Sequence, residues 1–235
     1  IYPILVDPWA WTIGRVVIGF CFCGVYITAE SWLNDAADNE VRGKSLSIYM
    51  IVQMAGIVLA QYIVTFGDVS GYVLFIVPSV LVSLAFAPIL LSKRPTPDFG
   101  QTKPMSIKEL VTTSPLASVG MFLLGGVFAA QFGMSAVYGS RVGLTVGQIS
   151  AFVSAIYIAA LVLQYPIGWV SDRVDRRLVI LGVAALGGAG SLIGIFYDSF
   201  TGILIAGAII GGMSNPLYAL LIAYANDYLE KEDMA

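Results

Sequence analysis

The sequence predicts an all-α, polytopic membrane protein with seven transmembrane helices. Of its 235 residues, 58% are hydrophobic and only 11% are charged, whereas a soluble domain has roughly 45–50% apolar and about 25% charged residues. The mean hydropathy is +0.85. So few charges cannot cover the surface of a soluble protein of this length, and a lipid bilayer is the solvent that suits this composition.

Six runs without a charged residue are each long enough to cross a bilayer, for which a helix needs about 20 mainly apolar residues. The runs are 45–67, 69–92, 110–140, 142–171, 178–197 and 199–226. A seventh span is predicted from about Trp9 to Leu33, which is apolar except for Arg15 and Glu30. Transmembrane strands are excluded because they are about 10 residues long with alternating polarity. Helices, in contrast, satisfy their backbone groups internally.

Local signals support several of these helices. Ser106 with Glu109 predicts a capping box for a short interfacial helix before the fourth span, and Thr145 with Gln148 predicts a capping box that opens the fifth span. Four prolines are expected inside spans, where neighbouring groups tolerate a kink. These prolines are Pro78, Pro88, Pro166 and Pro216.

The basic residues collect in alternate loops. Ten of the twelve lie on one side: Arg42, Lys44, Lys93, Arg94, Lys103, Lys108, Arg173, Arg176, Arg177 and Lys231. The opposite side holds Arg141 alone. Because cytoplasmic loops carry the excess of Lys and Arg, we expect the first residues to lie outside and the last in the cytoplasm.

Composition also excludes several functions. The net charge of −3 and the lack of basic runs argue against a nucleic-acid partner. The chain has no histidine and no nucleophile–base arrangement, so we expect neither an enzyme nor a metal site nor a cofactor. Cys21 and Cys23 are two residues apart in an apolar helix and therefore face different sides, which argues against a disulfide or a metal pair.

The loop after the fifth span carries a recognisable motif. It runs from Gly168 through Asp172, Arg173 and Asp175 to the pair Arg176 and Arg177. This resembles the cytoplasmic loop motif Gly-x-x-x-Asp-Arg-x-Gly-Arg-Arg of the major facilitator superfamily, with Asp175 where that family favours glycine. We expect Gly168 to let two helices approach closely, and Asp172 to cap a helix or pair with an arginine. An ordinary basic loop is the alternative.

The first span resembles the fourth helix of that family, in which an arginine is followed four residues later by glycine, as Arg15 is by Gly19. A charge within the bilayer is costly, so Arg15 should face a cavity or a partner, unless it reaches the outer interface. The string Ala-Glu-Ser-Trp that contains Glu30, and the Arg42 that follows, are similar to the YcaD-type bacterial members. Glu30 would either pair with Arg42 or a motif arginine, or carry a coupling proton.

An internal repeat points to the same register. At an offset of 192 residues, Trp32 pairs with Tyr224 and Asp35 with Asp227. In the family the two six-helix halves are parallel repeats. The resemblance therefore implies a fragment that covers about helices 4–10 of 12. Residues 1–91 would be the last three helices of the N-terminal bundle, 92–114 the cytoplasmic linker, and 115–235 the first four helices of the C-terminal bundle.

The resemblance also implies a central cavity lined or flanked by family helices 4, 5, 7, 8 and 10. The polar and aromatic residues within those spans are its candidates: Arg15, Gln53, Gln131, Tyr157, Asn215 and Tyr218. Hydrogen bonds between helices are the alternative role for each of them. We expect the pair Asn215–Pro216 to act as a hinge, and Gly207 and Gly211 to permit tight packing on a neighbouring helix.

These observations predict a secondary transporter in the bacterial inner (plasma) membrane, which moves a small-molecule solute by alternating access. The solute gradient or an ion gradient, conceivably of protons, would drive it. A seven-helix receptor fits the span count equally well, although the last span lacks the lysine that a retinal protein needs. A non-functional truncated product is the third alternative.

Overall fold

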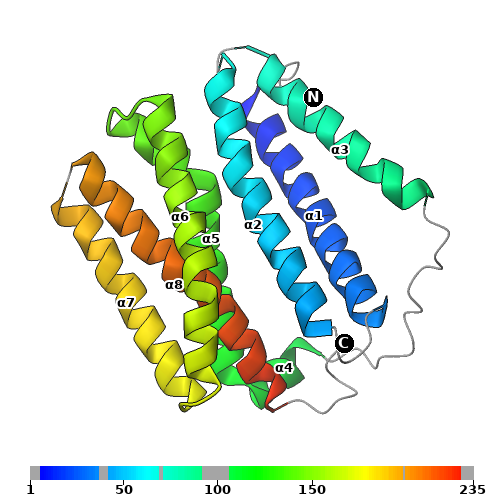
Figure 1. Cartoon of the computed structure of the whole chain (residues 1–235), viewed down its shortest axis with the longest axis vertical. Coiled ribbons are helices and arrows are strands. Elements are labelled where there is room, and N and C mark those ends of the chain that lie inside the picture. Colours follow the sequence, from blue (N-terminus) through cyan, green and yellow to red (C-terminus); the bar gives the residue numbers. More distant parts are fainter. Residues whose placement is uncertain (1–5, 37–41, 69–70, 92–105, 198, 229–235) are drawn as a thin grey trace. The chain divides into compact units, whose positions relative to one another are not determined.

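A computed structural model describes residues 6–36, 42–68, 71–91, 106–197 and 199–228. These residues form eight α-helices and no strand, which confirms the all-α prediction (Figure 1). The helices are α1 (Pro8–Ala36), α2 (Arg42–Phe66), α3 (Val73–Leu91), α4 (Ile107–Thr113), α5 (Pro115–Arg141), α6 (Val146–Ser171), α7 (Arg176–Phe196) and α8 (Phe200–Asn226).

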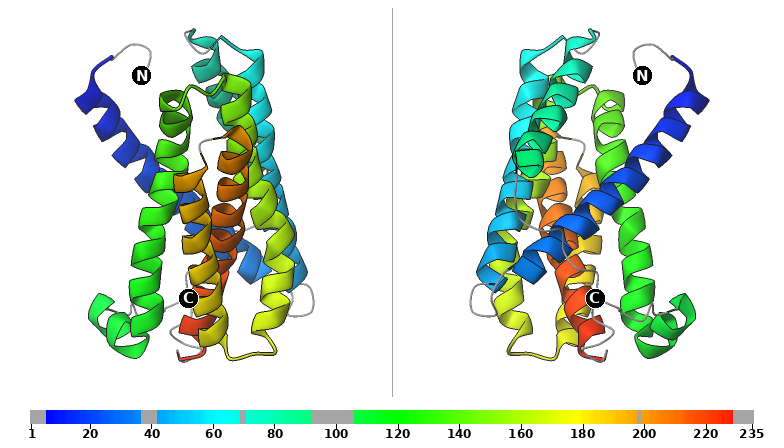
Figure 2. Two further views of the ribbon diagram at one scale, coloured as in Figure 1. Left: turned by 90° about the vertical axis from the view of Figure 1, so that its left-hand side faces the viewer. Right: turned by 90° about the vertical axis from the view of Figure 1, so that its right-hand side faces the viewer.

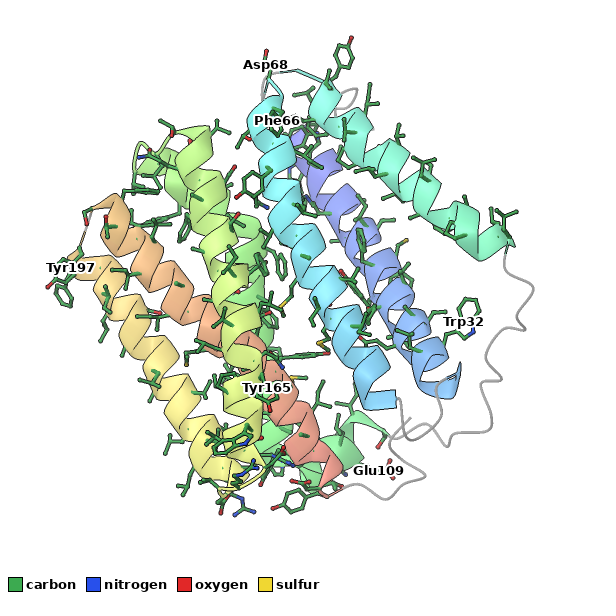
Figure 3. All side chains as sticks on the ribbon, in the orientation of Figure 1. Trp32, Phe66, Asp68, Glu109, Tyr165 and Tyr197 are labelled. Carbon is green, nitrogen blue, oxygen red and sulfur yellow. The ribbon has the colours of Figure 1, made fainter. Side chains whose placement is uncertain are left out.

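Six of these helices are long and apolar enough to cross a membrane, namely α1, α2, α5, α6, α7 and α8. The apolar part of α3 is shorter, at Val73–Pro88. Many large apolar side chains project outward from the helices; Tyr165, for example, is 78% exposed (Figure 3). Such a surface is stable only in lipid or against other apolar helices, so the chain is a multi-pass membrane protein.

The chain divides into two compact units. The first comprises residues 1–52 and 66–100, and in it α1 and α3 are exposed along most of their described lengths. The second comprises residues 53–65 and 101–235 and contains nearly all the buried side chains.

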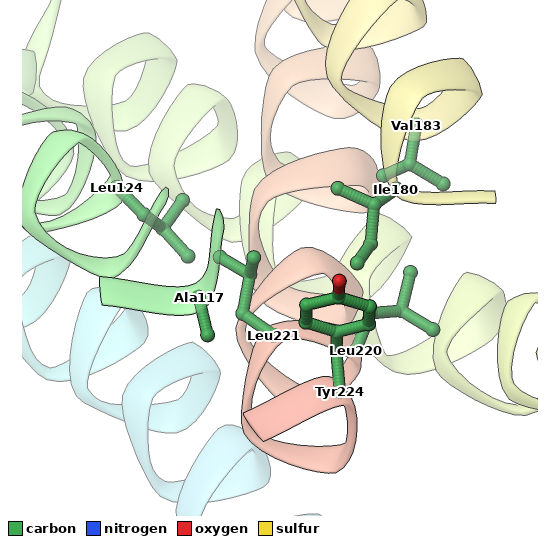
Figure 4. Packing of buried hydrophobic residues seen from close by; sticks show 7 residues of the cluster. All are labelled: Ala117, Leu124, Ile180, Val183, Leu220, Leu221 and Tyr224. Atoms are coloured by element: carbon green, nitrogen blue, oxygen red, sulfur yellow. The ribbon is translucent and has the colours of Figure 1, made fainter. Parts of the chain in front are cut away.

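Helix α8 is the central element of the second unit, where it packs against α5, α6 and α7. One core cluster joins three of these helices, and Figure 4 shows α5 and α7 contributing side chains from opposite sides of α8. Leu221 of α8, which is 1% exposed, packs beside Ala117 and Leu124 of α5. Ile180 and Val183 of α7 approach the other side of α8.

A second core cluster lies between α6 and the first turns of α8. Its buried members are Phe152, Ile156, Tyr157 and Ile203. Two partly buried side chains of α2, Ile57 and Val58, pack against it. The segment of α2 from 53 to 65 therefore belongs to the second unit through side-chain packing.

Two glycines of α8 allow its close approach to α6. A Cβ atom on Gly207 would lie 2.5 Å from the Phe152 ring. One on Gly211 would lie 2.4 Å from both the Cγ2 atom and the carbonyl oxygen of Ile156. These distances confirm the tight packing expected for this pair, because only glycine leaves room for the Phe152 ring at Gly207 and for the Ile156 backbone at Gly211.

The predicted helix signals also hold. Both capping boxes form, at Ser106 with Glu109 and at Thr145 with Gln148, and all four prolines lie inside helices. Within the second unit, α4, the turn between α6 and α7 and the end of α8 lie at one end, as the two side views agree (Figure 2). The turns after α5 and α7 lie at the other end.

The glycine contacts lead to a first prediction. We expect Gly211→Ala to destabilise the protein by about 1–3 kcal/mol, because the added methyl group overpacks the α6–α8 contact. The matched control is Gly182→Ala on α7, where an added Cβ meets nothing within 4 Å and helix propensity favours alanine. Thermal unfolding in detergent measures both. A melting temperature that falls equally in the two variants would contradict the proposed contact.

Candidate functional site

The two motif arginines at the start of α7 bind the end of α8. The Nη1 atom of Arg176 donates to the carbonyl oxygen of Ala223 at 3.0 Å and pairs with the carboxylate of Asp227. The Nε atom of Arg177 donates to the Tyr224 hydroxyl at 3.0 Å, and its Nη2 atom donates to the Tyr228 hydroxyl. We call Arg176, Arg177, Tyr224, Asp227 and Tyr228 the loop clamp.

The loop clamp involves two positions that the internal repeat singled out, Tyr224 and Asp227. Their repeat equivalents are Trp32, near the end of α1 and partly buried, and Asp35, whose side chain lies outside the described part. The function of Tyr224 and Asp227 was not predicted from the sequence. The repeat was the only signal that marked them, since the motif includes only the two arginines of the loop clamp.

Arg173 does not reach α8. Its Nη1 atom donates to the carbonyl oxygen of Trp169 at 3.0 Å, and its guanidinium lies 3.9 Å from the centre of the Trp169 ring. This contact is a local cation–π interaction at the end of α6. The three motif arginines therefore have different contacts: Arg173 binds the end of α6, whereas Arg176 and Arg177 bind α8.

Asp172 was expected either to cap a helix N-terminus or to pair with an arginine, and among the described residues it does neither. It follows the last residue of α6, and the N-cap of α7 is Asp175, whose side chain accepts a hydrogen bond from the backbone N–H of Arg177 at 2.9 Å. The departure from the family's glycine therefore supplies a cap. No helix of the described part approaches Gly168 closely, since a Cβ added there would meet nothing within 4 Å. Gly168, Asp172 and Arg176 instead border a small cavity of about 170 Å³.

The phenols of the loop clamp are coupled to Arg177. The Tyr224 hydroxyl donates to that of Tyr228 at 3.3 Å. This hydrogen bond and the one from Arg177 hold the pKa of the Tyr228 phenol below its usual value, because both stabilise the phenolate. Tyr228 is exposed, beyond the end of α8.

A larger cavity, of about 450 Å³, lies in the half of the second unit away from the loop clamp. Side chains of α5, α6, α7 and α8 line it. The candidate Gln131 is one of them; it is buried, and its Nε2 atom donates to the Ser214 hydroxyl of α8 at 2.9 Å. Ser214 was not predicted, although it adjoins the candidate Asn215.

Three further candidates, on α6 and α8, do not line this cavity. Tyr157 is buried with its ring 5.7 Å from that of Phe132, and the Tyr218 ring lies 6.2 Å from that of Phe128. The Nδ2 atom of Asn215 donates to the carbonyl oxygen of Gly211, one turn earlier in α8, at 3.1 Å.

The remaining candidates lie in α1 and α2. Arg15 is exposed on α1, Glu30 is partly buried near the end of that helix, and Gln53 is partly buried on α2. The side chain of Arg42, a proposed partner of Glu30, lies outside the described part of the chain. No group of three or more His, Cys, Asp or Glu side chains suited to a metal occurs among the described residues.

Comparison with known proteins identifies relatives of the whole chain. The family model of the Major Facilitator Superfamily matches residues 1–235. An uncharacterized MFS-type transporter YcaD of Salmonella arizonae is 23% identical and that of Escherichia fergusonii 24%, each over 98% of this chain. The MFS-type transporter YfkF of Bacillus subtilis is 25% identical over 96% of it.

The chain spans only part of these relatives. It covers 60% of the length of the two YcaD proteins and 59% of that of YfkF. It covers 47% of the length of a related MFS-type transporter of Yersinia pestis. No solved structure matches the chain.

The loop clamp leads to a second prediction, on pH. Because the Tyr228 pKa is lower in the folded state, this phenol adds its full stabilisation only above its unfolded pKa of about 10 and loses it as the pH falls through the folded pKa. An alkaline absorbance titration should therefore show one phenolate step at a pH below that of an ordinary tyrosine. This step should disappear in Tyr228→Phe. Tyr165→Phe, which removes an exposed phenol of α6, is the control and should keep that step. Titration curves of the same shape for Tyr228→Phe and Tyr165→Phe would contradict the lowered pKa of Tyr228.

Proposed function

Since the chain belongs to the Major Facilitator Superfamily, we propose that it functions in a secondary transporter, which moves a small solute across the membrane by alternating access. The observation that carries this proposal is the match of the family model to all 235 residues. The relatives named as MFS-type transporters support it. The family consists of transport proteins, so a catalytic function is not proposed.

The proposal assigns the chain to the middle of a twelve-helix carrier. Residues 1–91 are the last three helices of one bundle, 92–114 the linker, and 115–235 the first four helices of the other. Helix α4, with its capping box, is the described part of that linker. The distribution of basic residues supports a cytoplasmic position for the linker and the loop clamp, and an outside position for the first residues.

The loop clamp has a mechanical role in this scheme. Alternating access requires a bundle that moves as a nearly rigid body. The hydrogen bonds of Arg176 and Arg177 tie the start of α7 to the end of α8, joining residues 47 positions apart in the sequence. The clamp therefore keeps the helix ends of the second unit together while the bundle rocks. Glu30 and Arg42 are proposed to do the same near the end of α1.

The proposed solute site uses the polar residues within the spans. They are Arg15, Gln53, Gln131, Tyr157, Asn215 and Tyr218. Arg15 would attract a polar or anionic group of the solute, because charged residues within membrane spans usually face the bundle interior or a water-filled cavity. Glu30 is the acidic residue within a span and would carry the proton if transport is proton-coupled. The receptor alternative is not proposed, because the family model that matches the whole chain is one of transporters.

Transport by the purified chain in liposomes tests the proposal. We expect that at least one solute, from a panel of radiolabelled sugars, amino acids and aromatic acids, enters faster than into protein-free liposomes and with saturation. Arg15→Ala should slow this uptake by about tenfold or more, because a hydrogen bond to a charged group contributes about 1.5–3 kcal/mol. The control is Arg141→Ala, at the exposed end of α5.

Two results would count against parts of the proposal. Folded protein that transports none of the panel would contradict transport by this chain. Equal uptake by the wild type and Arg15→Ala would reject the role of Arg15 alone. A proton gradient should accelerate uptake by the wild type but not by Glu30→Gln if Glu30 carries the coupling proton.

A further inference from the structure

Gln131, which lines the 450 Å³ cavity of the second unit, has a buried polar atom without a partner among the described residues. Gln131 is 8% exposed and lines the cavity. Its Nε2 atom is satisfied by Ser214, but its Oε1 atom has no hydrogen-bond partner among the described residues. A buried unsatisfied acceptor costs roughly 1–3 kcal/mol. A ligand with a hydrogen-bond donor would remove that cost.

Other polar groups continue from Gln131 along one face of α5. Ser135 and Tyr138 follow it at the i+4 and i+7 positions, and both line the cavity. Ser191 of α7 lines it as well; its own hydroxyl donates to the carbonyl oxygen of Gly187 at 3.2 Å and leaves its oxygen able to accept. The cavity thus has a polar row on α5.

The remaining walls are apolar. Phe152 and Ile156 of α6 and Ile203 and Ile210 of α8 face the polar row. The lining contains no Asp, Glu, Lys or Arg. An ion would lose its hydration in such a site without gaining a counter-charge, so a charged ligand is disfavoured. The volume falls within the roughly 300–1,000 Å³ of small-molecule sites.

We propose that this cavity binds an uncharged, mainly apolar molecule whose hydroxyl or amide N–H donates to Oε1 of Gln131. The apolar body of the molecule lies against α6 and α8, and its polar end lies along α5. The identification of this molecule with the transported solute rests on the proposed function. Binding itself can be measured without transport.

Two naphthalene derivatives of nearly the same shape test whether binding needs a hydrogen-bond donor on the ligand. 2-Naphthol carries a hydroxyl donor, whereas 2-methoxynaphthalene can only accept. We expect saturable binding of 2-naphthol to the chain in lipid nanodiscs, after subtraction of empty nanodiscs, about five- to tenfold tighter than that of the methyl ether. Equilibrium dialysis gives both affinities.

A substitution of Gln131 then tests whether this residue accepts the hydrogen bond from the ligand. Gln131→Met removes the amide at similar volume and should make the two naphthalenes bind equally, at the affinity of the methyl ether. The matched control is Gln164→Met, a partly buried glutamine of α6 that borders the small cavity beside the loop clamp. It should keep the preference for 2-naphthol. The comparison of the two probes on the wild type decides the question even if Gln131→Met fails to fold.

Three results would overturn the inference. Equal binding of both probes to the wild type would show an apolar surface that a lipid tail or another helix covers. Tighter binding of the methyl ether would show that the hydroxyl donor gains nothing in the cavity. Loss of the preference in Gln164→Met would place the contact elsewhere. Binding without uptake in the liposome experiment would reject the transport proposal and leave this site intact.

Discussion

The structure of the second unit depends on the close contact between α8 and α6. Lipid tails are as apolar as the helices, so burial of apolar side chains does not drive helices together within a bilayer, and close packing must do so. Gly207 and Gly211 provide that packing, because a Cβ on either would overlap Phe152 or Ile156. Once α8 lies against α6, its other faces meet α5 and α7. The buried core, the cavity and the loop clamp all include residues of α8.

The two ends of this unit have different chemistry for physical reasons. At the end with the loop clamp, charged and phenolic side chains are partly in water, and Asp227 is 52% exposed. A surface ion pair of this kind contributes about 1 kcal/mol or less, so its value lies in fixing the geometry of the helix ends. In the other half, Gln131 is buried and borders a mainly apolar cavity, where an unpaired polar group costs more than it does in water.

Much of the fold could be predicted from the sequence, because a membrane span is a local property. The uncharged runs predicted the helices, and the spacing of Thr145 and Gln148 predicted a cap that forms. The loop motif was found, but the functions of its residues were assigned less well. Asp175 caps α7 where Asp172 was considered, and no described neighbour lies within 4 Å of a Cβ added at Gly168. A cap depends on which backbone N–H groups a turn leaves open, and a motif does not specify that geometry.

The sequence by itself determined the number, length and apolar character of the helices and their order along the chain, since each follows from about 20 consecutive residues and the hydrocarbon thickness. Only the tertiary structure decided which side chains meet. It placed Gln131 beside Ser214, 83 positions away, and Arg176 beside Asp227, 51 positions away. Such pairs depend on helix rotation and contact, for which an apolar sequence carries little signal: nearly every face of these helices is hydrophobic.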